Sequence, residues 1–429
     1  MNNDQLTIGN DQLPEGYKQT EIRVIPEDWQ PYRVGDVVSF SGGSQPPRST
    51  FVFKPKTGYL RLIQIRDYKT DVYETYIPEE LAKKKCTEQD VMIGRYGPPI
   101  FQILRGIEGA YNVAIIKTIP SEKIDREFLY QFIRNDELFK LMEMLSQRSS
   151  GQTGVELPAL REYPVALPPL EEQRSIAQAL SDVDRLIAAL DRAIAKKRAI
   201  KTATMQQLLT GKKRLPGFGE GKGYQQTKLG VIPEDWNVKC LGEVGQSLIG
   251  LTYRPEDTRD YGTLVLRSSN VQNDRLAYEN NVYVDSALPL LSRVIVEERD
   301  ILICVRNGSK QLIGKCALID AEAAGSAFGA FMSVFRTKIS GFIFYQFQSD
   351  VIQTQINEIM GATINQITNK DMAAFQIPLP PSDEEQREIA TVLSDMDAEI
   401  AALETRLAKT QSIKQGMMQQ LLTGKVRLV

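Results

Sequence analysis

Apolar residues recur at intervals of three and four along two long segments of the chain. In the first segment the two series are Ile176, Val183 and Leu190, and Leu180, Ile187 and Ile194. In the second segment they are Ile389, Met396 and Leu403, and Leu393, Ile400 and Leu407. This spacing gives a helix a narrow apolar seam that needs a partner helix. Because each segment offers one seam, we predict that the two helices pair with each other in antiparallel fashion.

Both predicted helices have marked ends. Ser382 and Glu385 have the spacing of a capping box, and acidic residues open each helix at 171–172 and 383–385. Gly211 and Gly424 suit a C-terminal stop. At about 1.5 Å per residue, each helix would reach roughly 50 to 60 Å. Antiparallel pairing would place the domains that precede the helices at opposite ends of the pair.

Shorter apolar runs before each long helix predict a mixed domain. Runs typical of strands occur at 59–65, 91–95 and 112–117, and their expected counterparts are at 263–267, 300–305 and 315–319. A helix follows in each copy, over 126–146 and over 342–360, with an apolar stripe that favours core packing. The order of elements therefore predicts an α+β fold that occurs twice.

Exact sequence repeats support this duplication. Val-Ile-Pro-Glu-Asp-Trp stands at 24–29 and at 231–236, and Gln-Leu-Leu-Thr-Gly-Lys stands at 207–212 and at 420–425. The chain is thus two copies of a unit of about 200 residues. Its two tryptophans, Trp29 and Trp236, occupy matching positions, which favours a shared structural anchor over two ligand platforms.

Composition narrows the functional class. The 429 residues are 42% hydrophobic and 25% charged, with no apolar run long enough to span a membrane and no signal-like start, so a cytoplasmic protein is expected. Four scattered cysteines indicate reduced thiols. The chain has no histidine, which removes the commonest general base and metal-binding imidazole. With a net charge of −2, DNA binding would need local basic patches.

No catalytic motif stands out. The four Pro-Pro pairs lack the flanking residues of the amino-methyltransferase motif, Asp/Asn/Ser-Pro-Pro-aromatic. The glycine-dense segment 217–223 lacks the spacing of a Walker loop and is interpreted as a connector. We therefore predict a protein that is not an enzyme, with no catalytic residues and no metal site.

The chain resembles the DNA specificity subunits of type I restriction–modification systems. A Leu-Pro-Pro-Leu-x-Glu-Gln type of opening to a long helix occurs at 167–173 and, in altered form, at 379–386, and it closes each mixed domain. The segments 42–46, 90–97 and 300–308 look like parts of that family's target recognition domains. Each motif is loose by itself, but their order and duplication are specific and cover nearly the whole chain.

The resemblance implies two mixed α/β target recognition domains separated by two long helices that pair as an antiparallel coiled coil, with an internal pseudo-twofold duplication. The first recognition domain would span 1–166 and the first helical spacer 167–214. The second recognition domain would span 215–378 and the second spacer 379–429.

The resemblance also implies a division of labour. Each domain would read one half of a bipartite site in double-stranded DNA, and the helices would set the distance between the half-sites. The chain would position methyltransferase subunits, two in number, and restriction subunits for N6-adenine methylation or ATP-dependent cleavage. S-adenosylmethionine, ATP and Mg would bind to those partners, and this chain would bind no cofactor and no membrane.

Polar and cationic residues on predicted loops are the candidates for DNA contact, because they can read base edges or bind phosphates. In the first domain they are Ser44, Gln45, Arg48, Gln64, Arg66, Arg95, Tyr96, Gln152 and Thr153. In the second they are Tyr253, Arg254, Arg267, Asn270, Arg306, Asn307, Lys310, Asn365 and Gln366. Any of them could instead be an ordinary surface residue. Arg95 and Arg306 are the best candidates, because each ends a predicted strand beside a glycine turn.

Two other functional classes stay open from the residues alone. The chain could be a coiled-coil DNA-binding regulator or scaffold without modification partners. It could also be a self-contained methyltransferase–nuclease, which the missing motifs disfavour. Co-purification with a methyltransferase subunit and turnover by the isolated chain distinguish the three possibilities.

Overall fold

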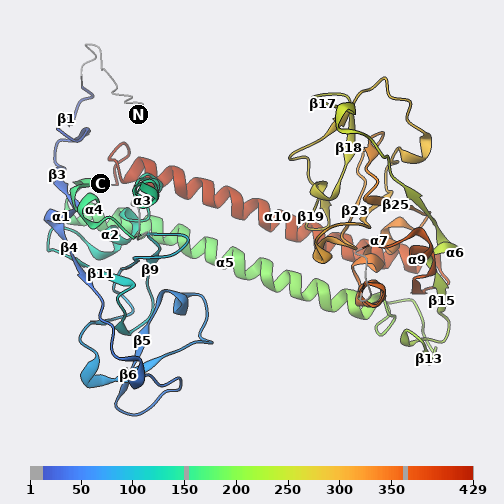
Figure 1. Cartoon of the computed structure of the whole chain (residues 1–429), viewed down its shortest axis with the longest axis horizontal. Helices are drawn as coiled ribbons and strands as arrows, with labels where there is room; N and C mark the ends of the chain where they lie inside the picture. The colour runs from blue at the N-terminus through green and yellow to red at the C-terminus, as the bar shows by residue number, and fades with distance from the viewer. Residues whose placement is uncertain (1–12, 149–153, 361–365, 429) are drawn as a thin grey trace. The chain divides into compact units, whose positions relative to one another are not determined.

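The computed structural model describes residues 13–148, 154–360 and 366–428 (Figure 1). The chain divides into two compact units, one formed by Met1–Leu190 with Arg406–Val429 and the other by Asp191–Thr405. The border between the units lies within both long helices, α5 (Leu170–Leu208) and α10 (Asp383–Leu421). Each unit therefore contains one mixed domain, the start of one long helix and the end of the other.

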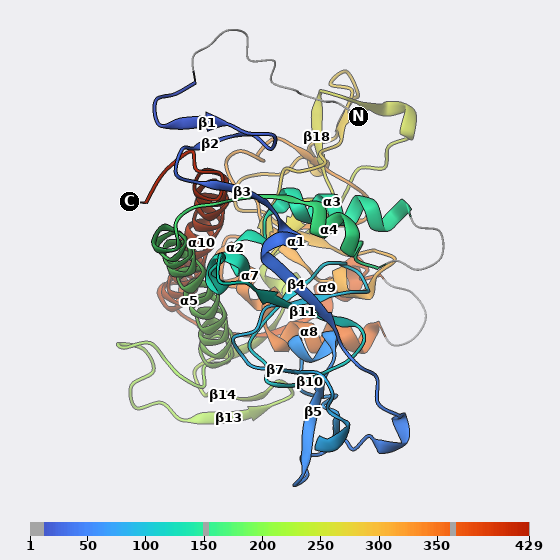
Figure 2. The same cartoon turned by 90° about the vertical axis from the view of Figure 1, so that its left-hand side faces the viewer.

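The first unit is built around two four-stranded sheets. One has the order β4 (Val38–Gly42), β11 (Ile115–Pro120), β8 (Met92–Gly94), β9 (Ile103–Leu104); the other has the order β6 (Tyr76–Pro78), β5 (Tyr59–Ile63), β10 (Gly109–Tyr111), β7 (Lys85–Cys86). Two-stranded pairs are formed by β1 (Tyr17–Gln19) with β2 (Val24–Pro26) and by β3 (Gln30–Arg33) with β12 (Pro164–Leu167). The short helices are α1 (Val34–Val37), α2 (Arg126–Phe132), α3 (Asp136–Arg148) and α4 (Leu157–Glu162). Figure 2, which faces this unit, shows β4 and β11 running alongside each other.

The second unit repeats this plan. Its sheets have the orders β16 (Gln246–Ile249), β25 (Met332–Arg336), β22 (Ile301–Cys304), β23 (Cys316–Leu318), and β17 (Thr258–Arg259), β21 (Tyr283–Val284), β18 (Thr263–Leu266), β24 (Ala327–Phe328). Pairs are formed by β13 (Tyr224–Thr227) with β14 (Gly230–Pro233), by β15 (Asn237–Cys240) with β26 (Gln376–Leu379), and by β19 (Val271–Gln272) with β20 (Arg275–Leu276). The short helices are α6 (Leu241–Val244), α7 (Ser340–Gln348), α8 (Asp350–Ile359) and α9 (Asn369–Ala374).

All six predicted runs contain strands, but one pair of counterparts was wrong. The strand that matches β11 is β25, because each lies second in its sheet, between the first strand and the strand that precedes the candidate arginine. The run at 315–319 forms β23, an edge strand that matches β9. Residues 112–114 form a turn before β11, closed by the Ile115 N–H donating to the Asn112 carbonyl at 3.0 Å.

The prediction of one continuous helix in each of the segments 126–146 and 342–360 was also wrong. The segment 126–146 is broken into α2 and α3, where the Asn135 side chain accepts the Glu137 N–H at 2.7 Å. The segment 342–360 is broken into α7 and α8 at Ser349, which has an extended backbone. In both cases a polar residue stands directly before the second helix, although the apolar stripe continues and is mostly buried.

The long helices confirm the antiparallel pairing within each unit. In the first unit, Leu180 near the start of α5 shares a core with Leu421 at the end of α10. In the second unit, Leu208 at the end of α5 shares a core with Leu393 near the start of α10. Each helix has 39 residues, or about 58 Å at 1.5 Å per residue. The predicted cap is present, since the Glu385 N–H donates to Ser382 Oγ at 3.4 Å.

The two tryptophans are structural anchors, as predicted. Trp29 is 0% exposed and Trp236 is 1% exposed, and each lies in the core that joins its domain to the helix ends. The four cysteines are free thiols; Cys240 is half-buried and the other three are buried. Within the ranges that the structure describes, no helix is both long and apolar enough to cross a membrane.

Candidate DNA-recognition interface

A single turn connects three of the loops that carry candidate residues in the first unit. We call residues 111–114, between β10 and β11, the first bridging turn. The Ser44 N–H donates to the Tyr111 carbonyl at 3.1 Å, and the Arg95 N–H donates to the Ala114 carbonyl at 2.8 Å. The turn's own Asn112 N–H donates to the carbonyl of Ile63, directly before Gln64, at 3.1 Å. The loops that begin at 44, 64 and 95 are therefore fixed to one another through backbone atoms.

The second unit has the same hydrogen-bond pattern. The second bridging turn, residues 328–331, joins β24 to β25. Its Phe328 carbonyl accepts the Leu251 N–H at 2.7 Å, and its Phe331 carbonyl accepts the Arg306 N–H at 3.1 Å. Its Gly329 N–H donates to the carbonyl of Leu266 at 2.9 Å, directly before Arg267. Side chains differ between the two turns, but the backbone positions of the candidate loops are kept.

Glycine is required where the first loop meets each bridging turn. A Cβ atom at Gly43 would lie 2.0 Å from the Asn112 carbonyl oxygen, and one at Gly250 would lie 2.2 Å from the Gly329 carbonyl oxygen. Real side chains do not approach backbone oxygens so closely. The glycine at the end of this loop is thus explained by packing against the turn rather than by direct contact with DNA.

The other candidates of the first unit lie at the margin of this arrangement. Gln45 and Arg48 are exposed in the loop after β4. Arg66 is exposed and lies over the ring of Tyr73 at 5.4 Å. Gln64 is half-buried, and its side-chain amide donates to Thr75 at 3.3 Å, which gives it a role inside the domain. Gln152 and Thr153 lie outside the described residues.

Several candidates of the second unit meet around its bridging turn. Arg306 is exposed and pairs with Gln366 in an isolated β-bridge, and the Asn307 amide donates to Ser268 Oγ at 3.3 Å. Arg267, next to Ser268, is half-buried and donates to the Asn280 carbonyl at 3.1 Å.

The remaining candidates of this unit lie farther along its loops. Tyr253 is half-buried and Arg254 is exposed in the loop that begins at Leu251. Lys310 is exposed and donates to the Met360 carbonyl at 3.2 Å. Asn365 lies outside the described residues.

The position of Asn270 does not favour the predicted DNA contact. Its side chain is 0% exposed, accepts the Arg267 N–H at 3.0 Å and donates to the Ala277 carbonyl at 2.9 Å. The matching residue of the first unit is Asp67, which accepts the Gln64 N–H at 2.9 Å and whose pKa is raised by burial. Both residues hold the loop in shape from within the domain.

A second repeated feature is the junction between the helix ends and each mixed domain. After α5, the Arg214 side chain donates to Glu385 Oε2 at 2.7 Å, near the start of α10, and to Asp235 at 2.9 Å. After α10, Arg427 donates to Glu172 Oε1 at 2.7 Å, near the start of α5, and to Asp28 at 2.6 Å. Asp28 and Asp235 belong to the repeated Val-Ile-Pro-Glu-Asp-Trp segment. The sequence repeats therefore mark the places where one helix ends beside the start of the other.

The repeated glycine and glutamine also act at these junctions. Gly211 and Gly424 have positive φ angles of 69° and 74°, and a Cβ atom there would lie 2.5 Å and 2.6 Å from Cδ of Pro233 and Pro26. The Gln173 amide donates to the Pro168 carbonyl at 2.9 Å. Glutamine in the Leu-Pro-Pro opening thus fixes the turn that leads into the helix.

The sequence model of one protein family matches most of the chain. The family is the type I restriction modification DNA specificity domain, matched at residues 26–197 and 233–415. The chain belongs to this family. The DNA specificity domain therefore occurs twice, once for each repeated junction and bridging turn.

Related proteins agree with this assignment. The putative type I restriction enzyme MjaX specificity subunit of Methanocaldococcus jannaschii is 28% identical over 96% of this chain and 97% of its own length. The type I restriction enzyme EcoKI specificity subunit of Escherichia coli is 31% identical over 46% of this chain and 44% of its own length. A crystal structure of the type I restriction-modification S subunit from M. genitalium has the same fold, with a TM-score of 0.58 at 13% identity, covering 92% of this chain and 96% of that one.

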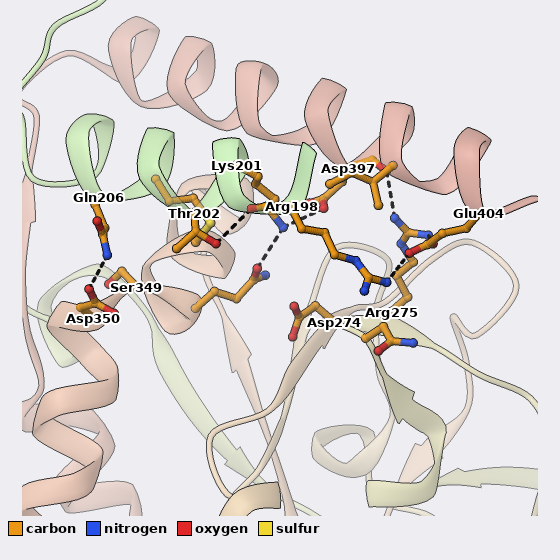
Figure 3. A pocket seen from close by; sticks show the side chains of 14 residues that line it. Arg198, Lys201, Thr202, Gln206, Asp274, Arg275, Ser349, Asp350, Asp397 and Glu404 are labelled. Atoms are coloured by element: carbon orange, nitrogen blue, oxygen red, sulfur yellow. Dashed lines mark hydrogen bonds and ion pairs between the residues drawn. The ribbon is translucent and has the colours of Figure 1, made fainter. Parts of the chain in front are cut away.

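One contact in this member of the specificity family was not predicted from the sequence. It joins the second mixed domain to the two long helices. A cavity of about 320 Å³ in the second unit is lined by α5, α10, the hairpin β19–β20, the end of α7 and the start of α8. Figure 3 shows the side chains that line it. Across it, Arg275 donates to the Asp397 carbonyl at 2.9 Å and lies 3.4 Å from Glu404. Lys201 of α5 binds the Asp397 carboxylate at 2.7 Å. No repeat in the sequence marks Arg275, so only the structure reveals this contact.

Proposed function

We propose that this chain reads a bipartite site in double-stranded DNA, with one half-site read by each mixed domain, for a type I restriction–modification system. The repeated bridging turn is the observation that carries the proposal. It fixes the loops of both domains with the same backbone hydrogen bonds while their side chains differ. A common frame with different side chains is what two readers of different half-sites require.

We assign residues 1–166 and 215–378 to the two readers, and residues 167–214 and 379–429 to the helical spacer regions. Two of the interhelical ion pairs, one in each unit, support a fixed helix register. Lys201 binds Asp397 at 2.7 Å in the second unit, and Lys414 binds Asp184 at 2.7 Å in the first. In the first unit the Lys414–Asp184 pair places position 190 of α5 opposite position 408 of α10, and the Lys201–Asp397 pair has the same offset in the second unit. A spacer with a fixed register can set the distance between half-sites.

Two copies of a methyltransferase subunit are the proposed partners of the helix ends. Each unit has a groove of about 600 Å³ beside the end of one long helix. Its lining includes Gln206, Thr210 and Lys212 in one unit and Gln419, Thr423 and Lys425 in the other. The glutamines and lysines are exposed, yet they are identical in both copies although most surface residues differ. Equivalent grooves with the same side chains suit two copies of one partner.

We propose that the chemistry belongs to the partner subunits. The methyltransferase subunits would bind S-adenosylmethionine, and restriction subunits would bind ATP and Mg. This chain would select the DNA in the cytoplasm without catalysing a reaction itself. Incubation of the purified chain alone with DNA and S-adenosylmethionine should give no methyl transfer, and transfer without a partner would contradict the proposal.

A matched insertion in both helices tests the spacer role. Seven residues inserted after Leu190 and seven after Leu407 keep the heptad pattern and the helix register, and they add about 10 Å to the pair. The sequence between the two half-sites should lengthen by about three base pairs at ~3.4 Å per pair, while both half-sites stay the same. Sequencing of methylated adenines, with the methyltransferase subunit co-expressed, measures the spacer.

An insertion in only one of the two helices is the control, because it moves the Lys201–Asp397 and Lys414–Asp184 pairs out of register. It should abolish methylation rather than change the spacer. If the double insertion leaves an active complex with an unchanged spacer, the proposed role of the helices is wrong.

A further inference from the structure

We propose that Arg95 and Arg306 read a base edge in the first and the second half-site, and that an aromatic ring positions each guanidinium for this purpose. The ring is Tyr96 in the first unit and Phe331 in the second. This inference rests on the proposed function and names the residues that would set one base preference in each half-site.

The backbone at both arginines is held from two sides. On one side, each arginine N–H donates to the last residue of its bridging turn, at 2.8 Å for Arg95 and 3.1 Å for Arg306. On the other side, the Arg95 carbonyl accepts the Val155 N–H at 3.1 Å, and the carbonyl just before Arg306 accepts the Ile367 N–H at 2.8 Å. Each side chain therefore leaves the domain from a defined backbone position.

Both guanidinium groups lie over an aromatic ring. The guanidinium carbon is 5.3 Å from the ring centroid of Tyr96 in one unit and of Phe331 in the other. The rings come from different positions, since Tyr96 follows its arginine and Phe331 belongs to the bridging turn. The arginines also differ by one backbone position, because the counterpart of Arg95 is Val305, whose N–H likewise donates to the Phe331 carbonyl at 3.1 Å. Both copies thus place an arginine on an aromatic ring beside the bridging turn, but with different residues.

A stacked guanidinium retains its N–H groups for a ligand. The ring face attracts the cation and restricts its plane, while the donors point outward along the edges. Among the described residues, neither Arg95 nor Arg306 takes part in an ion pair, whereas Arg336, at the far end of β25, binds Asp300 at 2.7 Å. Phe331 is 59% exposed, so the ring that supports Arg306 faces solvent instead of a core.

A planar pair of donors fits the edge of guanine in the major groove, where N7 and O6 accept two hydrogen bonds from one arginine. A contact with phosphate is the alternative. The two contacts differ in a measurable way, because a base contact changes sequence preference and a phosphate contact weakens all sequences alike and lowers the salt dependence.

The test uses the complete complex of this chain with its methyltransferase subunit and DNA targets in which each base of both half-sites is varied. Arg306→Lys keeps the positive charge but removes the two coplanar N–H donors that could bind one base together. It should reduce discrimination at one base of the second half-site by about five- to 150-fold and leave the first half-site unchanged. Arg95→Lys should do the same in the first half-site only.

Variants of the ring test its positioning role. Phe331→Leu should relax the same base position as Arg306→Lys, and Phe331→Tyr should restore discrimination because it keeps the ring. Arg293→Ala is the matched control, since Arg293 is exposed in the same unit, away from the bridging turn. Thermal unfolding of every variant shows whether the fold is intact.

The outcomes separate this inference from the proposed function. If folded Arg306→Lys and Arg95→Lys complexes keep full discrimination at every base, the inference is wrong. It is also wrong if both weaken all sequences equally and reduce the salt slope by about one, which indicates phosphate contact. In either case the proposed function stands as long as the unmodified complex methylates a bipartite site, and it fails if no such site exists.

Discussion

The two units share their junctions but differ in how the mixed domain meets the long helices. In the second unit, Arg275 of the hairpin β19–β20 binds α10 through the Asp397 carbonyl and Glu404. In the described part of the first unit, no hydrogen bond or ion pair joins the corresponding segment, 64–78, to α5 or α10. The repeated sequence therefore fixes the helix ends alike, whereas the divergent hairpin segment contacts α10 in the second unit and has no such contact in the described part of the first.

Substitution of Arg214 or Arg427, the arginines at the two junctions, should lower the free energy of unfolding the most. Arg214→Ala leaves the Glu385 side chain, 1% exposed, without its cationic partner, and we expect a loss of about 3 to 5 kcal/mol in the free energy of unfolding. Arg427→Ala should cost less, about 2 kcal/mol, because Glu172 still accepts the Trp29 indole N–H at 3.0 Å and the Leu428 N–H at 3.3 Å. Urea unfolding measures both variants.

Arg214→Lys is the control for charge, and it should recover part of the loss. Equal losses for the two alanine variants would mean that the additional partners of Glu172 contribute nothing, and the two junctions would then be energetically equivalent.

Acid should weaken the interhelical pair of the first unit. Burial alone would raise the pKa of Asp184, but hydrogen bonds from Lys414 and Arg134 outweigh it, so that the pKa lies below its ordinary value. Burial lowers the pKa of Lys414, and its hydrogen bond with Asp184 only partly opposes this shift. Because the folded pKa of Asp184 is depressed, its stabilisation is present above the unfolded value of about 3.9 and is lost as the pH falls through the folded value.

Urea midpoints at pH 5 and pH 3 test this expectation. Asp184→Asn should lower stability at pH 5 by on the order of 1 kcal/mol and should reduce the further loss at pH 3. If the variant and the natural chain lose the same stability between the two pH values, Asp184 does not contribute to the acid sensitivity.

Substitution of the two tryptophans should lower the free energy of unfolding by amounts that differ by the contribution of one hydrogen bond. Trp29 donates to Glu172, whereas the indole nitrogen of Trp236 has no hydrogen-bond partner among the described residues. Trp29→Phe should therefore cost about 1 kcal/mol more than Trp236→Phe in the free energy of unfolding. A larger loss for Trp236→Phe would show that packing, which differs between the two sites, decides the result.

Removal of the hairpin contact should have the smallest effect on stability. Arg275 is 42% exposed, so Arg275→Ala should cost about 0.5 to 1 kcal/mol. Amide hydrogen exchange should increase in β19–β20 and stay unchanged in the first unit. Unaltered exchange in the hairpin would mean that its apolar contacts, and not Arg275, hold it to the helices.

Local patterns predicted those parts of the fold in which each residue acts through near neighbours. The heptad seam gave the helices and their pairing, and the capping residues gave their ends. The breaks at Asn135 and Ser349 escaped prediction because the apolar stripe continues past them, and only the backbone shows that the helix does not. The burial of Asn270 escaped prediction for a related reason, since a polar residue on a loop looks the same in sequence whether it faces solvent or caps the loop from within.

In the candidate interface, too, the sequence indicated some residues, and only the fold showed how they meet. Arg95 and Arg306 were singled out because each was predicted to end a strand beside a glycine turn. In the structure both follow a strand and donate to the last residue of a bridging turn, but the backbone counterpart of Arg95 is Val305, one residue before Arg306. Phe331 could not be linked to Arg306 from sequence, because Phe331 precedes β25 and Arg306 follows β22, and the two residues meet only when these strands pair.

By itself, the sequence determined the duplication, the two long helices and their pairing, because repeats and heptads are periodic signals that can be read along one chain. The tertiary structure decided which repeated residues meet. Arg214 and Glu385, 171 positions apart, become partners only because the helices run in opposite directions. The bridging turns and the contact of Arg275 with α10 likewise depend on backbone and side-chain groups brought together by folding, for which no local pattern exists.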